Sequence, residues 1–365
     1  MNDIMVPPGM SAPGPSTSGG APRTKAAGLA GQPIPGLLAI PVLDTGPGFA
    51  LDTLDADPAR AHRLLDAPTK YVPKQALKAL DSVSRQWLVK WDNAYLPEID
   101  AIAARLDRPG VHFLSVMYEW ACTCAVKPSP DGDSARLVRV LDWLTPGLGR
   151  EVVAARVAGP SGLYVALTWP GFSGVIQAMA PGRFSAALNQ APMRFAVGLS
   201  PLDWVLARRR LWRTPHPMAA HILRRAFEEC ATYAEAKRFL ETQPIALPAI
   251  YSLAGIEPHE TCVIERTETA ARVFDGETVA ANHWQPDDAG ITEWRGHERG
   301  LDSRGRARLM PSLSADLTTD FSWACYPVMN PKTRLLMVAD AKAGRLVAVG
   351  CERSGFATQP LELAV

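Results

Sequence analysis

The pattern of apolar and polar positions divides the chain into alternating helical and stranded stretches. Apolar residues recur at helical spacing between Pro73 and Leu106, with Lys and Arg on the other face. From Cys122 onward, short Val-, Ala- and Leu-rich runs are separated by Gly, Pro and Asp turns, a pattern typical of strands. Residues 201–241 are again helical in pattern, and strands follow to near Cys351. This order predicts an α+β fold, a four-layer αββα sandwich with two sheets face to face and helices outside.

The expected elements can be placed more closely. Residues 33–58 are predicted to form an extended strap, because prolines and glycines interrupt the apolar positions. The predicted helices are 58–65, 73–106 divided near Pro97 with 96–106 as the second piece, 201–241 in several pieces with Thr232 as one N-cap, and 303–317 with a kink or split at Pro311. The predicted strands are 122–127, 135–143, 151–158, 163–168, 175–179, 184–188, 249–254, 261–265, 271–274, 279–282, 335–339 and 346–351.

Composition adds few constraints. The net charge of the 365 residues is +1, so no bulk field favours nucleic acid as a partner. The first residues lack a basic region followed by an apolar run, and the six cysteines fit no disulfide framework; both observations predict a cytoplasmic protein. Residues 1–32 are rich in Gly, Pro, Ala and Ser and are predicted to be a disordered leader.

The candidate chemistry lies where the helical pattern gives way to strands. Ala121 precedes Cys122 and Thr123, and a run carrying Arg139 and Asp142 follows. An internal cysteine can attack the carbonyl carbon of the residue before it, and hydrolysis of the resulting thioester frees its α-amine. That amine has a pKa of about 7.7–8.0 and can act as general base beside its own thiol. The pattern therefore predicts cleavage between Ala121 and Cys122, with Cys122 as the nucleophile.

Two charged residues are candidates to support this cysteine. A nearby arginine lowers a thiol pKa, and Arg139 is the candidate. Asp142 can pair with the new ammonium group or with Arg139. The two differ by three positions, so on a regular strand they face opposite sides, and both reach Cys122 only if a twist, a bulge or the strand end intervenes.

Other interpretations of these cysteines stay open. A single cysteine in an apolar context is commonly a small buried core residue. Cys122 and Cys124 as a metal or redox pair is a further alternative, although a metal site needs more Cys or His ligands than lie nearby in the sequence.

Several motifs in order carry a family resemblance. Tyr118-Glu119, Cys122-Thr123 and the Arg139 to Trp143 segment resemble the N-terminal-nucleophile amide hydrolases of the acid ceramidase and N-acylethanolamine acid amidase group, which are related to penicillin V acylases and bile salt hydrolases. The resemblance spans about residues 75–350. Its further motifs are residues 169–174, 180–184, 188–190, 282–284, 302–304 and 327–330.

The resemblance implies the αββα fold of this hydrolase class and a division of the chain. Residues 33–121 would be the propeptide or small subunit, which stays bound after cleavage and can meet lipid peripherally, and residues 122–365 the large subunit. The implied reaction is hydrolysis of the amide bond of N-acyl amines, such as fatty-acyl amides, through an acyl-thioester on Cys122. No metal or cofactor is expected.

The resemblance also suggests roles for individual residues. Asn282 would donate to the oxyanion, although an Asn after a strand is commonly a turn residue. Asn189 is a candidate to hold the substrate or the oxyanion. Gln190 stands where relatives carry a glutamate. Arg304 is a candidate, while Gly305 leaves open whether Arg306 is the equivalent residue.

Trp143, Trp169 and Phe172 are candidates for an apolar wall that receives the acyl chain; aromatic residues at strand ends are also commonly part of a core. Two other functions fit the same residues. One is an acyltransferase in which an amine replaces water, and the other is a non-catalytic acyl- or lipid-binding protein that keeps the fold.

Overall fold

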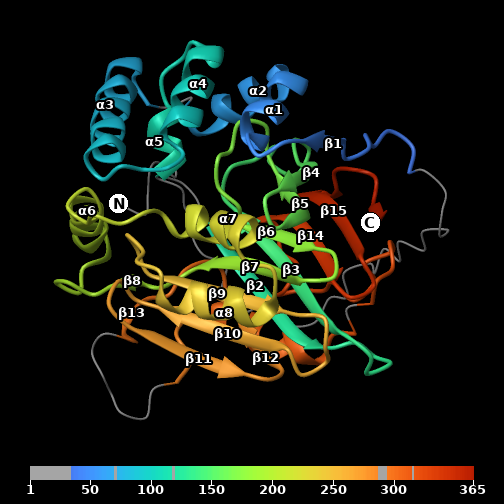
Figure 1. Ribbon diagram of the computed structural model, residues 1–365. Helices are drawn as coiled ribbons and strands as arrows, with labels where there is room; N and C mark the ends of the chain where they lie inside the picture. The colour runs from blue at the N-terminus through green and yellow to red at the C-terminus, as the bar shows by residue number, and fades with distance from the viewer. Residues whose placement is uncertain (1–33, 70–71, 117–119, 287–293, 315) are drawn as a thin grey trace, which may run out of the picture.

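The computed structural model describes residues 34–69, 72–116, 120–286, 294–314 and 316–365 (Figure 1). Its helices are α1 (Phe49–Ala56), α2 (Pro58–Thr69), α3 (Lys74–Lys90), α4 (Leu96–Leu106), α5 (Val111–Val116), α6 (Ser200–Leu211), α7 (Ala219–Glu229), α8 (Tyr233–Thr242), α9 (Ser303–Leu309) and the 3-10 turn η2 (Met310–Ser312). Its strands are β1 (Val42–Thr45), β2 (Trp120–Pro128), β3 (Ala135–Trp143), β4 (Val153–Gly159), β5 (Gly162–Thr168), β6 (Gln177–Ala180), β7 (Phe184–Gln190), β8 (Met193–Arg194), β9 (Ala249–Ala254), β10 (Thr261–Arg266), β11 (Ala271–Asp275), β12 (Thr278–Ala280), β13 (Gly296–His297), β14 (Thr333–Asp340), β15 (Arg345–Glu352), β16 (Gly355–Phe356) and β17 (Leu361–Ala364).

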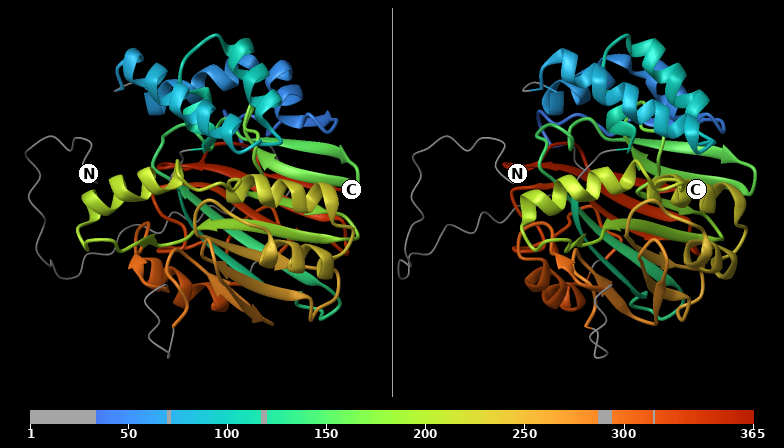
Figure 2. Two further views of the ribbon diagram at one scale, coloured as in Figure 1. Left: turned by 60° about the vertical axis from the view of Figure 1, so that its left-hand side comes forward. Right: turned by 90° about the vertical axis from the view of Figure 1, so that its left-hand side faces the viewer.

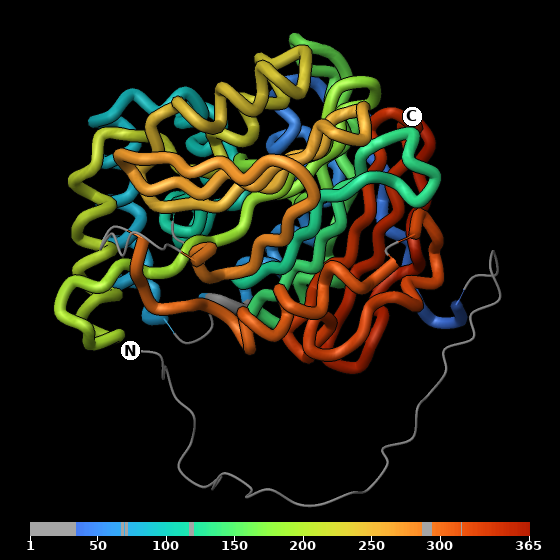
Figure 3. Tube along the Cα trace, turned by 90° about the horizontal axis from the view of Figure 1, so that it is seen from below, coloured from blue at the N-terminus to red at the C-terminus, as the bar shows by residue number. Residues whose placement is uncertain are grey.

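Two sheets packed face to face form the centre of the molecule. Within the described ranges, one has eight strands in the order β1-β4-β5-β6-β7-β9-β10-β11, and the other has the order β12-β2-β3-β14-β15-β16 with β17 beside β15. In Figure 3 the teal β2 and β3 run beside the red β14 and β15, which come from the far end of the sequence. Strands β2 and β3 of the second sheet contact β7 and β9 of the first.

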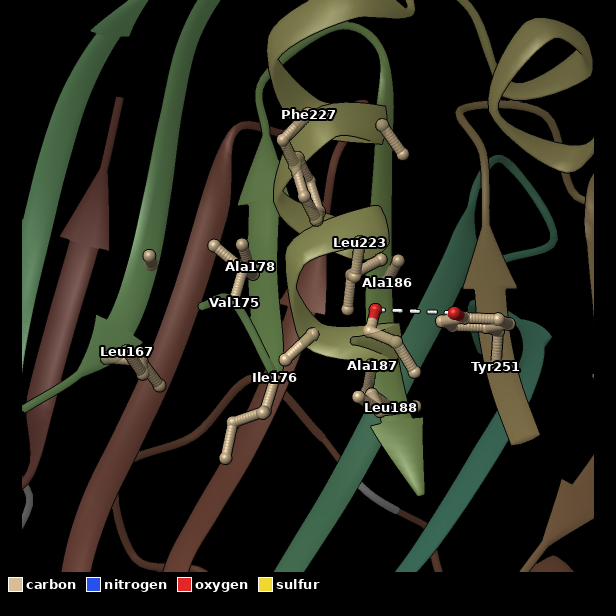
Figure 4. Close-up of a cluster of buried hydrophobic side chains, with 14 of the residues drawn as sticks. Leu167, Val175, Ile176, Ala178, Ala186, Ala187, Leu188, Leu223, Phe227 and Tyr251 are labelled. Atoms are coloured by element: carbon tan, nitrogen blue, oxygen red, sulfur yellow. Dashed lines mark hydrogen bonds between the residues drawn. The ribbon is translucent and has the colours of Figure 1, made fainter. Parts of the chain in front are cut away.

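Helices cover the outer faces of both sheets. Leu223 and Phe227 of α7 lie over the apolar surface of β6 and β7, and the Tyr251 hydroxyl of β9 donates to the Ala219 carbonyl at 3.3 Å (Figure 4). On the other side, Met310 of η2 belongs to a separate apolar cluster on the outer face of β3, β14 and β15. The predicted four-layer αββα sandwich is therefore confirmed by the arrangement of these layers.

Helices α1 to α5 form a further layer at one end of the sandwich (Figure 2). This part of the chain is tied into the sandwich because β1 pairs in parallel with β4, from Val42 opposite Ala154 to Thr45 opposite Val157. The bond between Ala121 and Cys122 falls inside β2. A cut there would leave residues on both sides of it held by strand pairing and packing.

Most predicted elements are present in the structure. Residues 49–56 form helix α1, so the prediction of an extended strap is wrong for that part. The helix predicted over 73–106 is divided as expected, since its second piece, Leu96–Leu106, is α4; the break lies at 91–95, and Pro97 stands in the first turn of α4, where a missing N–H costs nothing. Residues 111–116, expected only as a lead into β2, form α5. The leader predicted over 1–32 lies outside the described residues.

Two smaller predictions are confirmed. The Thr232 side chain caps α8 by accepting from the Glu235 N–H, as the sequence suggested. The split predicted near Pro311 is present, with α9 before it and η2 around it, because proline cannot continue a helix interior; the helical residues end at Ser312, short of the predicted end at 317.

Helices α1 to α5 make up the N-terminal layer. Arg224 of α7, a buried arginine, holds this layer to the sandwich. The Arg224 guanidinium donates to carboxylate oxygens of Glu98 on α4 and Glu228 on α7, and to the carbonyls of Pro47 at 2.7 Å and Ser173 at 2.9 Å. It also lies 4.1 Å from the ring centroid of Tyr95. These contacts come from both sides of Cys122, so Arg224 links the two parts of the chain.

Replacing Arg224 with Met should therefore destabilise the protein strongly. Two half-buried carboxylates and two carbonyls would lose the guanidinium as their donor, and the apolar surroundings would lose a paired charge, a loss of about 3 kcal/mol in the free energy of unfolding measured with urea. Arg225→Met is the matched control, since its pair with Glu229 lies at the surface of the same helix and should contribute no more than about 1 kcal/mol. Equal losses in the two variants would contradict the linking role of Arg224.

Candidate active site

Cys122 lies on β2 between the two sheets and is fully buried. Arg139 lies on the neighbouring strand β3, where it pairs directly with Cys124 of β2. Its guanidinium reaches both sulfur atoms, with Nη2 3.0 Å from the Cys122 Sγ and Nη1 3.2 Å from the Cys124 Sγ. The predicted proximity of Arg139 to Cys122 is present in the structure.

The remaining contacts of Arg139 hold its buried charge in one orientation. Nη1 donates to the Asn189 Oδ1 at 2.6 Å, and Nε donates to the Gln177 Oε1 at 3.1 Å. The Asn189 amide then donates to the carbonyls of Ala280 and Ala281. Asn189 therefore orients Arg139 and the loop after β12, and the role suggested from the sequence, holding the substrate or the oxyanion, stays a prediction. Gln177 was missed, since nothing in the sequence distinguishes it from a polar strand residue.

The pKa of the Cys122 thiol differs from the expected one. Burial raises the pKa of this thiol above its ordinary value, and the opposing effects of the Arg139 and Arg306 charges are smaller. The sequence led us to expect a lowered pKa from Arg139 alone. In the intact chain the thiol is thus held protonated, because the sandwich excludes water from it.

Asp142 lies on the opposite face of β3 from Arg139. The register of β2 with β3 is regular throughout, so the three-residue spacing separates the two side chains as it does on any strand. The Asp142 carboxylate accepts from the Asn330 amide at 2.7 Å and from the Thr333 hydroxyl at 2.7 Å, and lies 3.6 Å from the Arg306 guanidinium. Its cationic partner is therefore Arg306, and the suggested pair with Arg139 is not formed.

The irregularity expected between Arg139 and Asp142 is absent from β3, and a shift in pairing lies in β14 instead. The pairing of β14 with β3 shifts between Thr333 and Leu335. This shift occurs opposite the end of β3, where Thr333 pairs with Asp142. Thr333 at the start of β14 and Asn330 just before it contact Asp142 at this end of β3, which the spacing within β3 could not show.

Arg306 of α9 binds the backbone of the cysteine itself. Its Nη1 donates to the Cys122 carbonyl and to the Thr123 hydroxyl, each at 2.7 Å, and its Nη2 donates to the Asn282 Oδ1 at 3.0 Å. Arg304 lies elsewhere: its side chain is 61% exposed and pairs with Glu298. Two residues apart on a helix, the arginines point to nearly opposite sides, so Arg306 and not Arg304 belongs to this cluster.

Asn282 holds the nitrogen of Cys122. Its Oδ1 accepts from the Cys122 N–H at 2.7 Å, and its Nδ2 donates to the Gln190 carbonyl at 2.8 Å. The Gln190 side chain accepts from the Trp120 N–H at 3.0 Å, one residue before the predicted cleavage site. Asn282 and Gln190 therefore fix the chain on both sides of Ala121.

The loop that carries Asn282 has supports that the sequence did not reveal. Ser303 Oγ accepts from the Asn282 N–H at 2.9 Å and lies 2.7 Å from the His283 Nδ1. Glu265 of β10 accepts from the Gln285 N–H at 2.7 Å and pairs with Arg272 of β11. Ser303 stands in a motif noted in the sequence, but its partner became apparent only in three dimensions.

Two cavities meet beside this cluster. One, of about 340 Å³, is lined by Ala121, Trp120, Gln190 and Lys332 among others. The other, of about 320 Å³, has mainly apolar walls from α2, α4, α5 and the loops around residues 143–148 and 169–172. Trp143 borders both.

The three aromatic residues predicted to form an apolar wall all line the second cavity, namely Trp143, Trp169 and Phe172. Ring contacts connect them in series to Trp120, with centroids 5.4 Å apart for Trp120 and Trp143 and 5.6 Å for Trp143 and Trp169. This series leads from the scissile segment to an apolar space at the boundary between the N-terminal layer and the sandwich.

In the ranges that the structure describes, no three His, Cys, Asp or Glu side chains are grouped so as to hold a metal ion. The helices of the same ranges are all too short or too polar to cross a membrane.

Comparison with known proteins finds similarity to acid ceramidases and no matching family model. The chain is 31% identical to acid ceramidase of Bos taurus over 108 residues, 28% of this chain and 25% of that protein. It is 27% identical to acid ceramidase of Homo sapiens over 146 residues, 39% of this chain and 34% of that protein. The matches thus span about a quarter to a third of the length of these curated relatives, and they confirm the resemblance to acid ceramidases.

Two solved structures are also similar. An N-acylethanolamine-hydrolyzing acid amidase ortholog of Caenorhabditis elegans matches with a TM-score of 0.46 and 20% identity, covering 66% of this chain and 100% of that chain. A mutant of conjugated bile acid hydrolase from Clostridium perfringens matches with a TM-score of 0.35 and 9% identity, covering 67% of this chain and 92% of that chain.

Glu265, which supports the Asn282 loop, should make the free energy of unfolding depend on pH. Burial raises the pKa of Glu265 to about 7, although the Gln285 N–H and Arg272 favour its ionised form. The pKa of the Glu265 carboxyl is higher in the folded state than in the unfolded state. Its stabilising contribution is therefore fully present at pH values below the unfolded-state pKa. That stabilisation is lost as pH rises to about 7, a loss of about 3 kcal/mol.

Glu265→Gln should remove this pH dependence. The free energy of unfolding of the wild-type protein should fall relative to the variant between about pH 4.5 and 7.5, as measured by urea denaturation across that range. Parallel curves for the two proteins would show that Glu265 has the same pKa folded and unfolded.

Proposed function

We propose that the chain cleaves itself between Ala121 and Cys122, and that the freed Cys122 is the nucleophile of a hydrolase acting on the amide bond of N-acyl amines. The observation that carries this proposal is that three side chains converge on three atoms of one residue. Arg139 contacts its sulfur, Asn282 its nitrogen and Arg306 its carbonyl oxygen. A core cysteine has no need of such partners.

Self-cleavage begins with attack of the Cys122 sulfur on the Ala121 carbonyl carbon. The C–N bond breaks, a thioester forms, and the thiol proton ends on the Cys122 nitrogen. Water then hydrolyses the thioester and leaves a carboxylate on Ala121. The Asn282 Oδ1 already accepts from this nitrogen at 2.7 Å, so it would keep the new amine beside the sulfur.

The same groups would serve the hydrolysis of a substrate. The α-amine takes the thiol proton, and the Arg139 guanidinium, 3.0 Å from the sulfur, stabilises the thiolate. The thiolate attacks the substrate carbonyl, the protonated amine product leaves, and water releases the acid from the acyl-thioester. A donor to the oxyanion contributes about 3–4 kcal/mol to such a step. Asn282, expected from the sequence to supply that donor, has its Nδ2 on the Gln190 carbonyl in the uncleaved chain, so it would serve the oxyanion only after releasing that carbonyl. No metal or cofactor enters this sequence.

The acyl group would occupy the apolar cavity lined by Trp143, Trp169 and Phe172. Burying a methylene there stabilises the complex by about 0.8 kcal/mol. The relatives named acid ceramidase support an N-acyl amine as the substrate class. Residues 33–121 and 122–365 would act as two associated subunits, joined by Arg224 and the pairing of β1 with β4. The cytoplasmic location and the peripheral lipid contact stay predictions.

Self-cleavage predicts two fragments, of 121 and 244 residues, that together make up the 365-residue chain. Intact mass measurement of the purified protein, held at pH 5 and at pH 7.5, should reveal both. Cys122→Ala should stay uncleaved, since no nucleophile remains. Cys124→Ala is the matched control, because that sulfur shares Arg139 but lies two residues from the bond.

Persistence of a single chain in the wild-type protein at both pH values would contradict self-cleavage. Binding of an N-acyl amine without turnover would then favour a non-catalytic acyl-binding protein. A product analysis with added amine distinguishes an acyltransferase from a hydrolase.

The two neighbouring arginines provide a second test. Arg306→Gln removes the donor to the Cys122 carbonyl and to Asn282, and should lower the rates of self-cleavage and of substrate hydrolysis by about 100-fold or more. Arg304→Gln should leave both rates unchanged, because its exposed side chain pairs only with Glu298 among the described residues. Rates would be followed by intact mass and by release of the free acid. Equal effects of the two substitutions would show that Arg306 has no special role.

A further inference from the structure

Several charged groups around the cavity beside Ala121 have partners within the protein. Asp142 is satisfied by Asn330, Thr333 and Arg306. Glu298 pairs with Arg304 at 2.6 Å, and His297 lies 2.9 Å from Asp203. These groups are therefore neutralised by the protein itself.

Lys332 is different. Its side chain lines the same cavity and is half-buried, yet it has no acidic partner in the described parts of the chain. The Arg299 side chain lies on the wall of the cavity as well and donates from Nε to the Ala191 carbonyl. An ammonium group placed at a cavity without a counter-ion favours an anion in that cavity.

The place of Lys332 relative to the scissile bond is set by strand pairing. Trp120 pairs with Trp143, and the Trp143 N–H donates to the Lys332 carbonyl at 2.8 Å. Lys332 is thus two strands from Trp120, about 10 Å at the usual spacing of strands. The flexible four-carbon stem of a lysine can cover much of that distance.

Under the proposed hydrolysis, each of the two cavities would hold one part of the substrate. Trp143 separates the apolar cavity, suited to the acyl chain, from the cavity that holds Lys332. With the acyl chain in the apolar cavity, the part of the substrate beyond the amide nitrogen would enter the cavity with the unpaired ammonium group.

We propose that the amine released by this site carries a carboxylate, so that the substrates are N-acyl amino acids, and that Lys332 binds this carboxylate. The inference rests on the proposed amide hydrolysis and specifies its amine. The amide C–N bond breaks, the acyl group passes to the Cys122 sulfur, the amino acid leaves with the proton, and water releases the fatty acid. Lys332 acts on specificity and takes no part in these bond changes.

The test compares two substrates with the same acyl chain, N-acylglycine and N-acylethanolamine, which differ in a carboxylate against a hydroxymethyl group. The self-cleaved wild-type enzyme should have the higher kcat/KM for N-acylglycine. Lys332→Gln should lower kcat/KM for N-acylglycine by about 10- to 100-fold, the equivalent of one hydrogen bond to a charged group, mainly through KM. It should leave the value for N-acylethanolamine unchanged.

Two variants serve as controls. Lys332→Arg keeps the positive charge and should retain most of the preference for N-acylglycine. Lys342→Gln removes a surface lysine that pairs with Glu257 away from this cavity, and should change neither substrate.

The outcomes separate the inference from the function on which it rests. An equal loss for both substrates in Lys332→Gln, or a wild-type preference for N-acylethanolamine, overturns the carboxylate-binding role while amide hydrolysis stands. Turnover of neither substrate by a wild-type chain that is not cleaved at Cys122 overturns the proposed function and this inference together.

Discussion

The buried guanidinium of Arg139 is the constraint on which the arrangement around Cys122 depends. A positive charge enclosed between two sheets is costly unless every donor finds an acceptor. Here the acceptors come from Gln177 and Asn189 of the facing sheet and from the two cysteine sulfurs of β2. Because Arg139 binds acceptors on both sheets, it fixes how the two sheets are placed against each other at this point.

This constraint extends to the nitrogen of the cysteine. Asn189, held by Arg139, donates to the carbonyls of Ala280 and Ala281, and the next residue is Asn282. Asn282 then accepts from the Cys122 N–H. Sulfur and nitrogen of Cys122 are therefore positioned through one hydrogen-bonded series, which starts from the same guanidinium.

The site would have different chemical groups before and after the proposed cleavage. In the uncleaved chain, Cys122 lies inside a continuous strand, and burial holds its thiol protonated by raising its pKa. Under the proposed cleavage, the chain gains an amine next to that sulfur, and a base appears where none existed. Arg224 would keep the released N-terminal layer in place, so the apolar cavity at its boundary with the sandwich would survive the cut.

How far the sequence predicted this structure depended on whether the signal was local. Alternating apolar runs placed β3 and β9 with their bounds, and a single threonine marked the start of α8. Helix α1 was missed because the prolines and glycines before it dominated the pattern. The partner of Asp142 was missed because Asn330 lies 188 residues away, and the choice between Arg304 and Arg306 needed the rotation of α9. The thiol pKa was misjudged because burial, which outweighs the arginine charge, cannot be read from a motif.

The most direct test of Cys122 as an N-terminal nucleophile is to trap its acyl-enzyme. The protein would be mixed with an N-acyl amine, quenched in acid within a turnover, digested, and examined by peptide mass spectrometry. We expect a peptide that begins at Cys122 and carries the acyl mass, and that loses this mass in neutral hydroxylamine as a thioester does. Turnover of the substrate while Ala121 and Cys122 remain joined, or with the acyl group on Cys124, would contradict the mechanism.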